Sequence, residues 1–401
     1  MTSSGHETKY LIGILAAFSA VGPVATQILL PALPSIQSGF AIDLGTTQLT
    51  LSLSLLAMAL AQVACGSWSD RVGRLPTAIW GLVIYFAGSV ICGLAPNIWI
   101  LIVGRVIQGA GGAFGIVLSR AIIRDVYGPE RSAAVISIVT MAFVVAPMLA
   151  PVIGGILTDY THWRFVFVFT SCVGLLVLAL VWWGLKETRQ LEEHGDEGTA
   201  RLRAIDLIRQ PLFLSYALQC GFTMGIFFVF IASAPFVVVN ILGHTATIYG
   251  IGFVIISIGY VIGNLISARI SERIGTDAMM LAGTFLAFLS AVLFGGLLIA
   301  GYWTLWAIFL PGAMIALSAG LSLPSAQTSA INVAPEAAGV ASGITGFLQL
   351  AFGAITAQLV GILTTTTPYP MVAGALIMAV LAFLSVLFSR RYSFSQVNRR
   401  E

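Results

Sequence analysis

The chain has 401 residues, of which 58% are hydrophobic and only 9% are charged. A soluble domain carries about 25% charged residues, so this composition excludes a soluble globular protein and makes the lipid bilayer the expected solvent. The net charge of +3 is spread over many short segments, which excludes the concentrated basic patch of a nucleic-acid-binding protein.

Twelve apolar runs are long enough to cross a bilayer, because a spanning helix needs about 20 apolar residues. The expected helices are 10–33, 47–68, 76–95, 98–122, 132–157, 163–185, 212–239, 249–270, 278–300, 303–325, 337–363 and 370–389. Residues 186–211 are dense in charge and contain no apolar run long enough to span. The predicted organisation is therefore an N-terminal six-helix bundle (1–185), a cytoplasmic linker (186–211) and a C-terminal six-helix bundle (212–401).

Basic residues sort by topology. Apart from Arg105, they fall in or beside the two tails and every second gap between apolar runs, whereas the other gaps hold only Arg164. This pattern predicts a multi-pass protein with both termini in the cytoplasm. In this assignment Arg120, Arg124 and Arg131 border the gap between the fourth and fifth helices.

The sequence offers no chemistry typical of an enzyme. Its four cysteines are dispersed through apolar runs and form no pair with metal-ligand spacing, so neither a metal nor a cofactor is expected. No carboxylate or histidine lies at the middle of a predicted span, and a membrane-embedded enzyme would need a nucleophile with its base, or metal ligands. A receptor or scaffold would have no need for the repeated turns described next.

Two similar turns occur at corresponding places in the two halves. Residues 69–74 read Ser-Asp-Arg-Val-Gly-Arg after the second helix, and residues 271–276 read Ser-Glu-Arg-Ile-Gly-Thr after the eighth. Parallel repeats with a binding site near the bilayer midplane are a known transporter plan. The expected fold is thus all-α, with 12 transmembrane helices in two pseudo-symmetric six-helix bundles.

The first turn belongs to a longer motif made of Gly66, Asp70, Arg71, Gly73 and Arg74. This motif resembles the cytoplasmic signature of the major facilitator superfamily. Thr47-Thr-Gln-Leu-Thr-Leu together with Gly66-Ser-Trp-Ser-Asp-Arg-Val-Gly-Arg resembles the bicyclomycin and chloramphenicol resistance branch of its 12-helix drug:proton antiporters. We expect a cytoplasmic gate in which Asp70 faces a helix N-terminus or a nearby arginine such as Arg124, with Glu272 and Arg273 as the second copy.

Arg105 lies inside an apolar run and is followed by Gln108, one turn along the same helix face. A charge at membrane depth costs about 2.5–3.5 kcal/mol on insertion scales, so Arg105 needs partners facing a polar cavity. The alternative is that it reaches outward to the headgroups or ties together carbonyl groups at helix ends. In the family it resembles, the matching arginine is tied to proton coupling.

A third motif lies in the fifth helix. It consists of Ala150, Pro151, Gly154 and Gly155, preceded by Pro147, and it resembles the family's antiporter signature with alanine in place of the first glycine. That signature goes with exporters. Ordinary packing of a proline-kinked helix is the alternative interpretation.

The first helix departs from the branch. Gln27 stands four residues before Pro31, where the branch carries an aspartate, and glutamine cannot carry a proton. Three explanations stay open: a peripheral acid such as Asp43 titrates, Arg105 competes directly with a proton or a cation, or transport is not coupled to protons.

The function expected is secondary efflux of small amphipathic compounds, neutral or anionic because no fixed negative charge lies at midplane, with protons as the coupling ion. A dedicated exporter of a sugar, nucleoside or other metabolite is the alternative. Gln27, Arg105, Gln108, Tyr260, Asn264 and Asp43 are the expected substrate or coupling residues. The resemblance implies a protein of the bacterial inner membrane that acts as a monomer.

Overall fold

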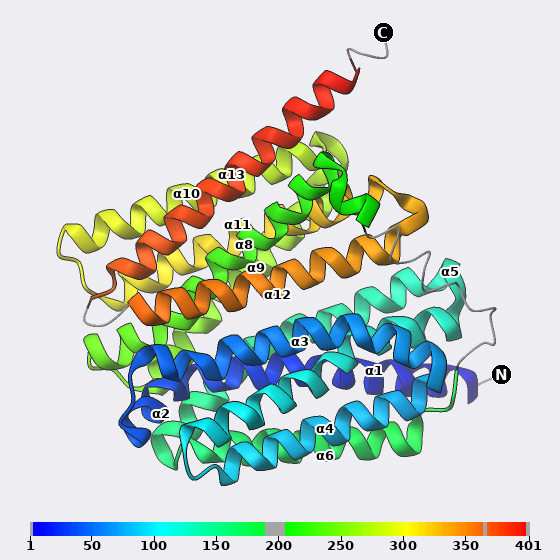
Figure 1. The fold of residues 1–401 in the computed structure, drawn as a ribbon, viewed down its shortest axis with the longest axis horizontal. Helices are drawn as coiled ribbons and strands as arrows, with labels where there is room; N and C mark the ends of the chain where they lie inside the picture. Colours follow the sequence, from blue (N-terminus) through cyan, green and yellow to red (C-terminus); the bar gives the residue numbers. More distant parts are fainter. Residues whose placement is uncertain (1–2, 189–204, 364–366, 398–401) are drawn as a thin grey trace. The chain divides into compact units, whose positions relative to one another are not determined.

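The computed structural model describes residues 3–188, 205–363 and 367–397, with side chains in these ranges except those of 3–8, 129–131, 133–134, 137, 140–144 and 393–397. All regular structure in the described residues is helical (Figure 1). Eleven of the described helices are long and apolar enough to cross a membrane, and Val145–Tyr160 is a shorter apolar helix. The expectation of an all-α membrane fold is confirmed.

The chain forms two compact units, each described by itself. The first unit comprises residues 1–192 together with His244–Ile251, and the second comprises 193–243 together with 252–401. Helices of the first unit are α1 (Ser3–Leu29), α2 (Leu33–Phe40), α3 (Leu44–Val72), α4 (Arg74–Leu94), α5 (Ile98–Tyr160) and α6 (Arg164–Gly184). Helices of the second unit are α8 (Pro211–Phe236), α10 (Thr276–Ile299), α11 (Leu305–Asn332), α12 (Ala338–Leu363), α13 (Tyr369–Val397) and most of α9 (Ala246–Ile274).

The first expected helix is longer than predicted. It was expected to end at Leu33, but a 3₁₀ turn at Leu30–Ala32 joins α1 to α2, which continues to Phe40. Pro31 and Pro34 lack the N–H that an α-helix needs, so they change the hydrogen-bond pattern locally without ending the helical path.

The fourth and fifth expected helices meet at one residue. In α5 the backbone leaves helical geometry only at Gly128, where φ is 66° and ψ is 176°. A residue with a Cβ rarely adopts this conformation, so glycine sets the position of the break. We call Ile98–Gly128 the first limb of α5 and 129–160 the second limb. The predicted end at Ile122 is wrong, and Arg120 and Arg124 lie inside the first limb.

The first limb is the centre of the first unit because its glycines allow close helix contact. A Cβ on Gly112 would lie 2.8 Å from the Cα of Gly22 in α1, and one on Gly109 would lie 2.6 Å from the carbonyl oxygen of Ser54 in α3. Gly115 approaches the Phe18 carbonyl oxygen of α1 more closely still. Small residues at such crossings are the usual basis of helix association in lipid, where the hydrophobic effect contributes little.

In the second unit, α8 takes the central position. Gly221 and Gly353 each receive a phenylalanine ring of the facing helix, Phe352 and Phe228 respectively. The hydroxyl of Thr356 in α12 donates to the Gly225 carbonyl oxygen of α8 at 3.3 Å. The two halves therefore use the same device, a central helix with small residues at its crossings.

Arg164 breaks the charge pattern for a structural reason. Its guanidinium lies over the rings of Trp163 and Phe40, at 4.4 Å and 5.9 Å from their centroids, and donates to the Ala95 carbonyl oxygen at 2.7 Å. These contacts join three connecting segments at one end of the unit. Arg164 thus stabilises a loop cluster, which accounts for a basic residue on the side that the charge pattern leaves free of them.

The central position of the first limb leads to a stability prediction. Gly115→Ala should lower the free energy of unfolding by about 1–3 kcal/mol, because the new methyl group would press α1 away from the first limb. Gly296→Ala in α10 is the matched control, since no atom lies within 4 Å of its added Cβ. Thermal unfolding of both variants in detergent measures the difference, and an unchanged Gly115→Ala melting temperature contradicts this view of the packing.

Candidate functional site

Arg105 is buried inside the first unit and is only 1% exposed. Its Nε donates to the Thr50 carbonyl oxygen of α3 at 3.2 Å, and its Nη1 donates to the Ala25 carbonyl oxygen of α1 at 3.3 Å. Nη1 also donates to the side-chain oxygen of Gln108. The guanidinium is therefore held by protein dipoles and does not reach outward to the headgroups.

Gln108 extends this cluster to two more helices. Its amide donates to the hydroxyl of Ser89 in α4 at 2.7 Å and to the hydroxyl of Thr170 in α6 at 3.3 Å. The hydroxyl groups of Ser89 and Thr170 donate their protons to carbonyl oxygens of their own helices, so toward Gln108 they can only accept. The NH₂ group of Gln108 must therefore face them, which leaves its oxygen for Arg105. Five helices of one unit thus converge on the pair Arg105–Gln108, which the sequence analysis identified correctly as neighbours.

The cluster has unused hydrogen-bonding capacity. Within the described ranges, the Nη2 of Arg105 and the side-chain oxygen of Gln27 are buried without a partner. No carboxylate in the same ranges lies within 4 Å of the guanidinium. An unneutralised buried charge is costly, so the site is a strong potential ligand for an anion or for a polar group of a substrate.

Asp43 occupies a different position. It is the N-cap residue of α3, where its carboxylate accepts from the Thr46 hydroxyl at 2.5 Å and from the Thr46 N–H at 2.9 Å. Both bonds favour the ionised form, so the Thr46 hydroxyl and then its N–H hold the pKa of Asp43 below its ordinary value. This geometry speaks against Asp43 as the group that exchanges protons near neutral pH.

Tyr260 and Asn264 lie in the second-unit part of α9. The Asn264 amide donates to the Tyr260 carbonyl oxygen at 2.9 Å, one turn earlier in the same helix. The amide is therefore partly satisfied by its own backbone.

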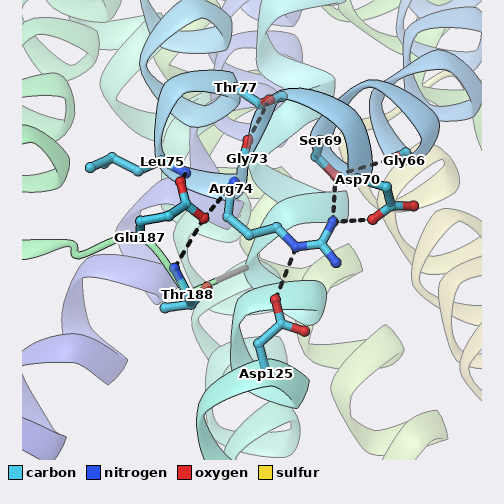
Figure 2. Close-up of polar contacts among 10 residues, drawn as sticks. All are labelled: Gly66, Ser69, Asp70, Gly73, Arg74, Leu75, Thr77, Asp125, Glu187 and Thr188. Carbon is cyan, nitrogen blue, oxygen red and sulfur yellow. Dashed lines mark hydrogen bonds and ion pairs between the residues drawn. The ribbon is translucent and has the colours of Figure 1, made fainter. Parts of the chain in front are cut away.

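The expected gate motif forms an ion cluster around Arg74 (Figure 2). Its Nη1 lies 2.5 Å from the Asp70 carboxylate and 2.6 Å from the Ser69 hydroxyl, while Nε donates to Asp125 at 2.9 Å. Asp125 lies on the first limb of α5, so Arg74 ties the α3–α4 turn to the end of that limb. Asp70 pairs with a nearby arginine as predicted, but that arginine is Arg74 and not Arg124, because the helix turns the neighbouring Asp125 toward the cluster.

Glu187, which is 113 residues from Arg74 in sequence, also contacts this turn. Its carboxylate accepts the backbone N–H groups of Arg74 at 2.9 Å and Leu75 at 3.1 Å (Figure 2). It thereby caps the N-terminus of α4, where negative charge is favourable. A Cβ on Gly73, whose φ is 110°, would lie 2.7 Å from the Glu187 carboxylate, so glycine is required there.

The remaining residues of the motif differ from expectation. Gly66 has open space where a Cβ would be, and Arg71 and Arg124 are exposed. Tight packing at Gly66 is therefore not observed in this part of the chain.

The second copy of the turn repeats the backbone but not the charges. Gly275 has φ 86° and ψ 156°, against 110° and 158° at Gly73. Glu272 and Arg273 are exposed and form no ion pair among the described residues. Thr276 stands in the place of Arg74 and accepts from the hydroxyl of Ser329 in α11 at 3.1 Å. A hydroxyl pair thus replaces the ion cluster, and the predicted second ionic latch is not formed here.

The antiporter motif joins three segments of the first unit. Gly154 packs against the Ile28 carbonyl oxygen of α1, and a Cβ on Gly155 would lie 2.6 Å from the Ala246 carbonyl oxygen at the start of α9. Ala150 and Pro151 are buried beside them, whereas Pro147 is half-buried. The motif thus gives the second limb of α5 two close helix contacts.

One turn further, Asp159 caps α9. Its carboxylate accepts the N–H groups of Ala246 at 3.1 Å and Thr247 at 2.7 Å. The sequence analysis assigned no role to Asp159, Asp125 or Glu187, because each is visible in the sequence only as an acid beside a basic residue or at a helix end.

Comparisons with known proteins agree with this architecture. Residues 14–357 match the Major Facilitator Superfamily. An uncharacterised MFS-type transporter, YdgK of Bacillus subtilis, is 31% identical over 95% of this chain and 96% of its own length. A bicyclomycin resistance protein homolog of Haemophilus influenzae is 27% identical over 94% of this chain and 96% of its own.

A solved structure shows the same fold. It is a bacterial homolog of the human lysosomal transporter Spinster in an inward-facing, unoccupied conformation, and it aligns with a TM-score of 0.76 at 17% identity over 96% of this chain and 97% of its own. Together with the relatives, it places the chain among transporters rather than enzymes.

The ion cluster predicts that lysine cannot replace Arg74. Arg74→Lys should lower the free energy of unfolding by about 2 kcal/mol, because an ammonium group cannot contact Asp70, Asp125 and Ser69 in a fixed fork. Arg269→Lys is the control, since Arg269 is exposed and forms no ion pair among the described residues. Equal thermal stability of the two variants would show that the cluster contributes nothing.

The N-cap geometry predicts that Asp43 has no role in proton exchange at neutral pH. With a pKa below its ordinary value, the carboxylate stays ionised from pH 6 to pH 8, so Asp43→Asn should leave the pH profile of transport unchanged over that range. Its stabilising bonds should be lost only as the pH falls below about 4, through the lowered pKa. A shifted transport profile at neutral pH would restore Asp43 as the titrating acid.

Proposed function

The chain belongs to the Major Facilitator Superfamily, and on this basis we propose that it is a secondary efflux transporter for small amphipathic compounds, coupled to protons. The bicyclomycin resistance homolog among its relatives supports export of drug-like molecules. The transported compounds are neutral or anionic, since the described spans contain no buried carboxylate that would favour a cation.

The observation that carries this proposal is the Arg105–Gln108 cluster. A buried guanidinium that uses only part of its hydrogen-bonding capacity is costly to a protein that needs it solely for stability. A transporter can use it, because a substrate group or a water molecule that delivers a proton completes its coordination during the cycle. Arg105 is accordingly the coupling residue we propose, and Gln27 and Gln108 set its surroundings.

Alternating access is the mechanism that fits a fold with two repeated halves. In our proposal the Arg74 cluster stabilises the closed state at the cytoplasmic end and Asp159 stabilises the opposite end of the second limb. Loss of the Asp70–Arg74 pair would shift the balance between the two states.

The charge pattern supports the location we propose. The protein resides in the bacterial inner membrane with both termini in the cytoplasm, as the basic gaps indicate. It works as a monomer, because one chain contains both halves.

Proteoliposome uptake of labelled chloramphenicol, a neutral amphipathic compound, tests the proposal. Uptake by the parent protein should rise when a pH gradient is imposed and respond little to voltage alone. Arg105→Lys should lower the rate at least tenfold, because lysine cannot reach the carbonyl oxygens of Thr50 and Ala25 and Gln108 together. Gln27→Asp should respond more strongly to pH, since it adds a titratable group two residues from Ala25.

The assay distinguishes failure of proton coupling from failure of the efflux function. Uptake that ignores the pH gradient in the parent rules out proton coupling but leaves efflux standing. Absence of any uptake by correctly folded parent protein rules out the efflux function itself.

A further inference from the structure

Tyr85 is a tyrosine near the middle of α4, and its hydroxyl group lacks a partner. The side chain is 0% exposed, and within the described ranges its hydroxyl oxygen forms no hydrogen bond. Buried tyrosines usually place this group against a donor or an acceptor, because burial without a partner destabilises the fold. Phenylalanine would fill the same space without that cost, so the hydroxyl group needs an explanation.

The ring of Tyr85 is fixed between two other helices. A Cβ on Gly174 of α6 would lie 2.8 Å from the ring, and one on Gly112, in the first limb of α5, would lie 3.5 Å from it. These glycines follow Thr170 and Gln108 by one helical turn each. Since the ring has no room to swing away, the hydroxyl group can change partners only by rotating about its C–O bond.

The hydroxyl group of Tyr85 lies beside the two acceptors of the Arg105–Gln108 cluster. It interacts with the hydroxyl groups of Ser89 and Thr170, although without the geometry of a hydrogen bond. Both of these groups already accept from the Gln108 amide, and both donate their own protons to backbone carbonyl oxygens. Toward Tyr85 they can therefore only accept, so Tyr85 and Gln108 are alternative donors to the same two oxygens.

Thr170 is the acceptor that Gln108 gives up more easily. The Gln108 amide lies 2.7 Å from the Ser89 hydroxyl but 3.3 Å from that of Thr170, which is beyond the usual length of such a bond. Thr170 also belongs to α6, the helix that contacts the ring of Tyr85. A small rotation of the Tyr85 O–H group therefore suffices to replace the longer bond.

Replacement of Gln108 by Tyr85 as the donor, which we call the donor exchange, keeps the hydrogen bonds balanced. In the described structure the Tyr85 hydroxyl and the Nη2 of Arg105 are unused. After the exchange Thr170 still has a donor, and the Gln108 amide and Arg105 both face a ligand. Two arrangements with similar numbers of hydrogen bonds differ little in free energy, as is required of an element that a ligand can switch.

We propose that Tyr85 is a positioning residue of the transport site, and that the donor exchange frees Gln108 to bind an acceptor oxygen of the cargo together with Arg105. Carbonyl, nitro and carboxylate oxygens have the required chemistry, since the freed amide and Nη2 present N–H groups to one atom. Tyr85 itself does not touch the cargo and acts through Gln108. Its role in transport rests on the proposed efflux function, whereas the donor exchange is a property of the first unit alone.

A stability cycle on the full chain in detergent tests the donor exchange without any transport measurement. Tyr85→Phe should leave the melting temperature of the parent unchanged or raise it, because the lost hydroxyl has no partner there. In a Gln108→Ala background the hydroxyl has taken over Thr170, so the same substitution should lower the melting temperature by about 2–4 °C. Tyr302→Phe, which removes a hydroxyl from a side chain that is 60% exposed, is the control and should change neither value.

Two results of this cycle would overturn the donor exchange. An equal loss in both backgrounds would show that Tyr85 already has a partner in the parent, such as a water molecule. No loss in either background would show that its hydroxyl never replaces the amide. Gln108→Leu, which keeps most of the side-chain volume, takes the place of Gln108→Ala if that variant does not fold.

Uptake of chloramphenicol by proteoliposomes tests the role in transport. Tyr85→Phe should raise the KM about fivefold with little change in the maximal rate, because the cargo-bound arrangement loses one hydrogen bond. With Ser89→Ala and Thr170→Val combined, the acceptors are gone and Tyr85→Phe should add no further change. A merely structural role would instead lower the maximal rate through loss of folded protein.

The two measurements separate this inference from the efflux function. An unchanged KM for Tyr85→Phe, in a parent that transports chloramphenicol, rules out the positioning role and leaves efflux standing. A folded parent that shows no uptake rules out the efflux function, and the stability cycle then decides whether the donor exchange occurs.

Discussion

The contact of Arg105 with backbone carbonyl oxygens is the interaction on which the first unit depends. Lipid supplies no hydrogen bonds, so a guanidinium inside a span must find its partners within the protein. Thr50 and Ala25 offer carbonyl oxygens from two neighbouring helices, and Gln108 passes the interaction on to Ser89 and Thr170. The close packing of the first limb makes this possible, because glycines bring α1 and α3 near enough for one side chain to contact both. The hydrogen bonds of Arg105 therefore depend on the close packing of these helices.

The arginines of the first limb and its surroundings fall into two classes. Arg74 is matched by two carboxylates and joins the α3–α4 turn to the end of the limb, as a structural ion pair does. Arg105 has no carboxylate partner in the part of the chain that is described, and its Nη2 is buried there without a hydrogen-bond partner. Charges of the first class hold a conformation, whereas charges of the second class are available to a ligand. This division is the physical basis for assigning them different roles.

The internal repeat is closer in backbone than in chemistry. Gly73 and Gly275 adopt nearly the same dihedral angles, since both helix pairs turn within a single residue. The first turn is fastened by ions and the second by the hydroxyl groups of Thr276 and Ser329. Hydroxyl pairs are weaker and less sensitive to salt than ion pairs. The turn at residues 69–74 is therefore held more strongly than the turn at residues 271–276, although the backbone follows the same course in both.

By itself the sequence determined the order of the helices and the place of Arg105 within an apolar run, because a bilayer demands long apolar runs and makes any interruption conspicuous. It also identified Gln108 as a neighbour, since residues three apart share a helix face. Only the tertiary structure decided that Arg74, and not Arg124, pairs with Asp70 and that Asp125 joins them, because these contacts depend on the direction of each side chain after packing. The same holds for Asp159 and Glu187, whose partners are 88 and 113 residues away at the farthest. Finally, the break between the fourth and fifth helices lies at Gly128 and not after Ile122. Composition could not locate it, because a glycine ends a helix only where the fold requires its backbone angles.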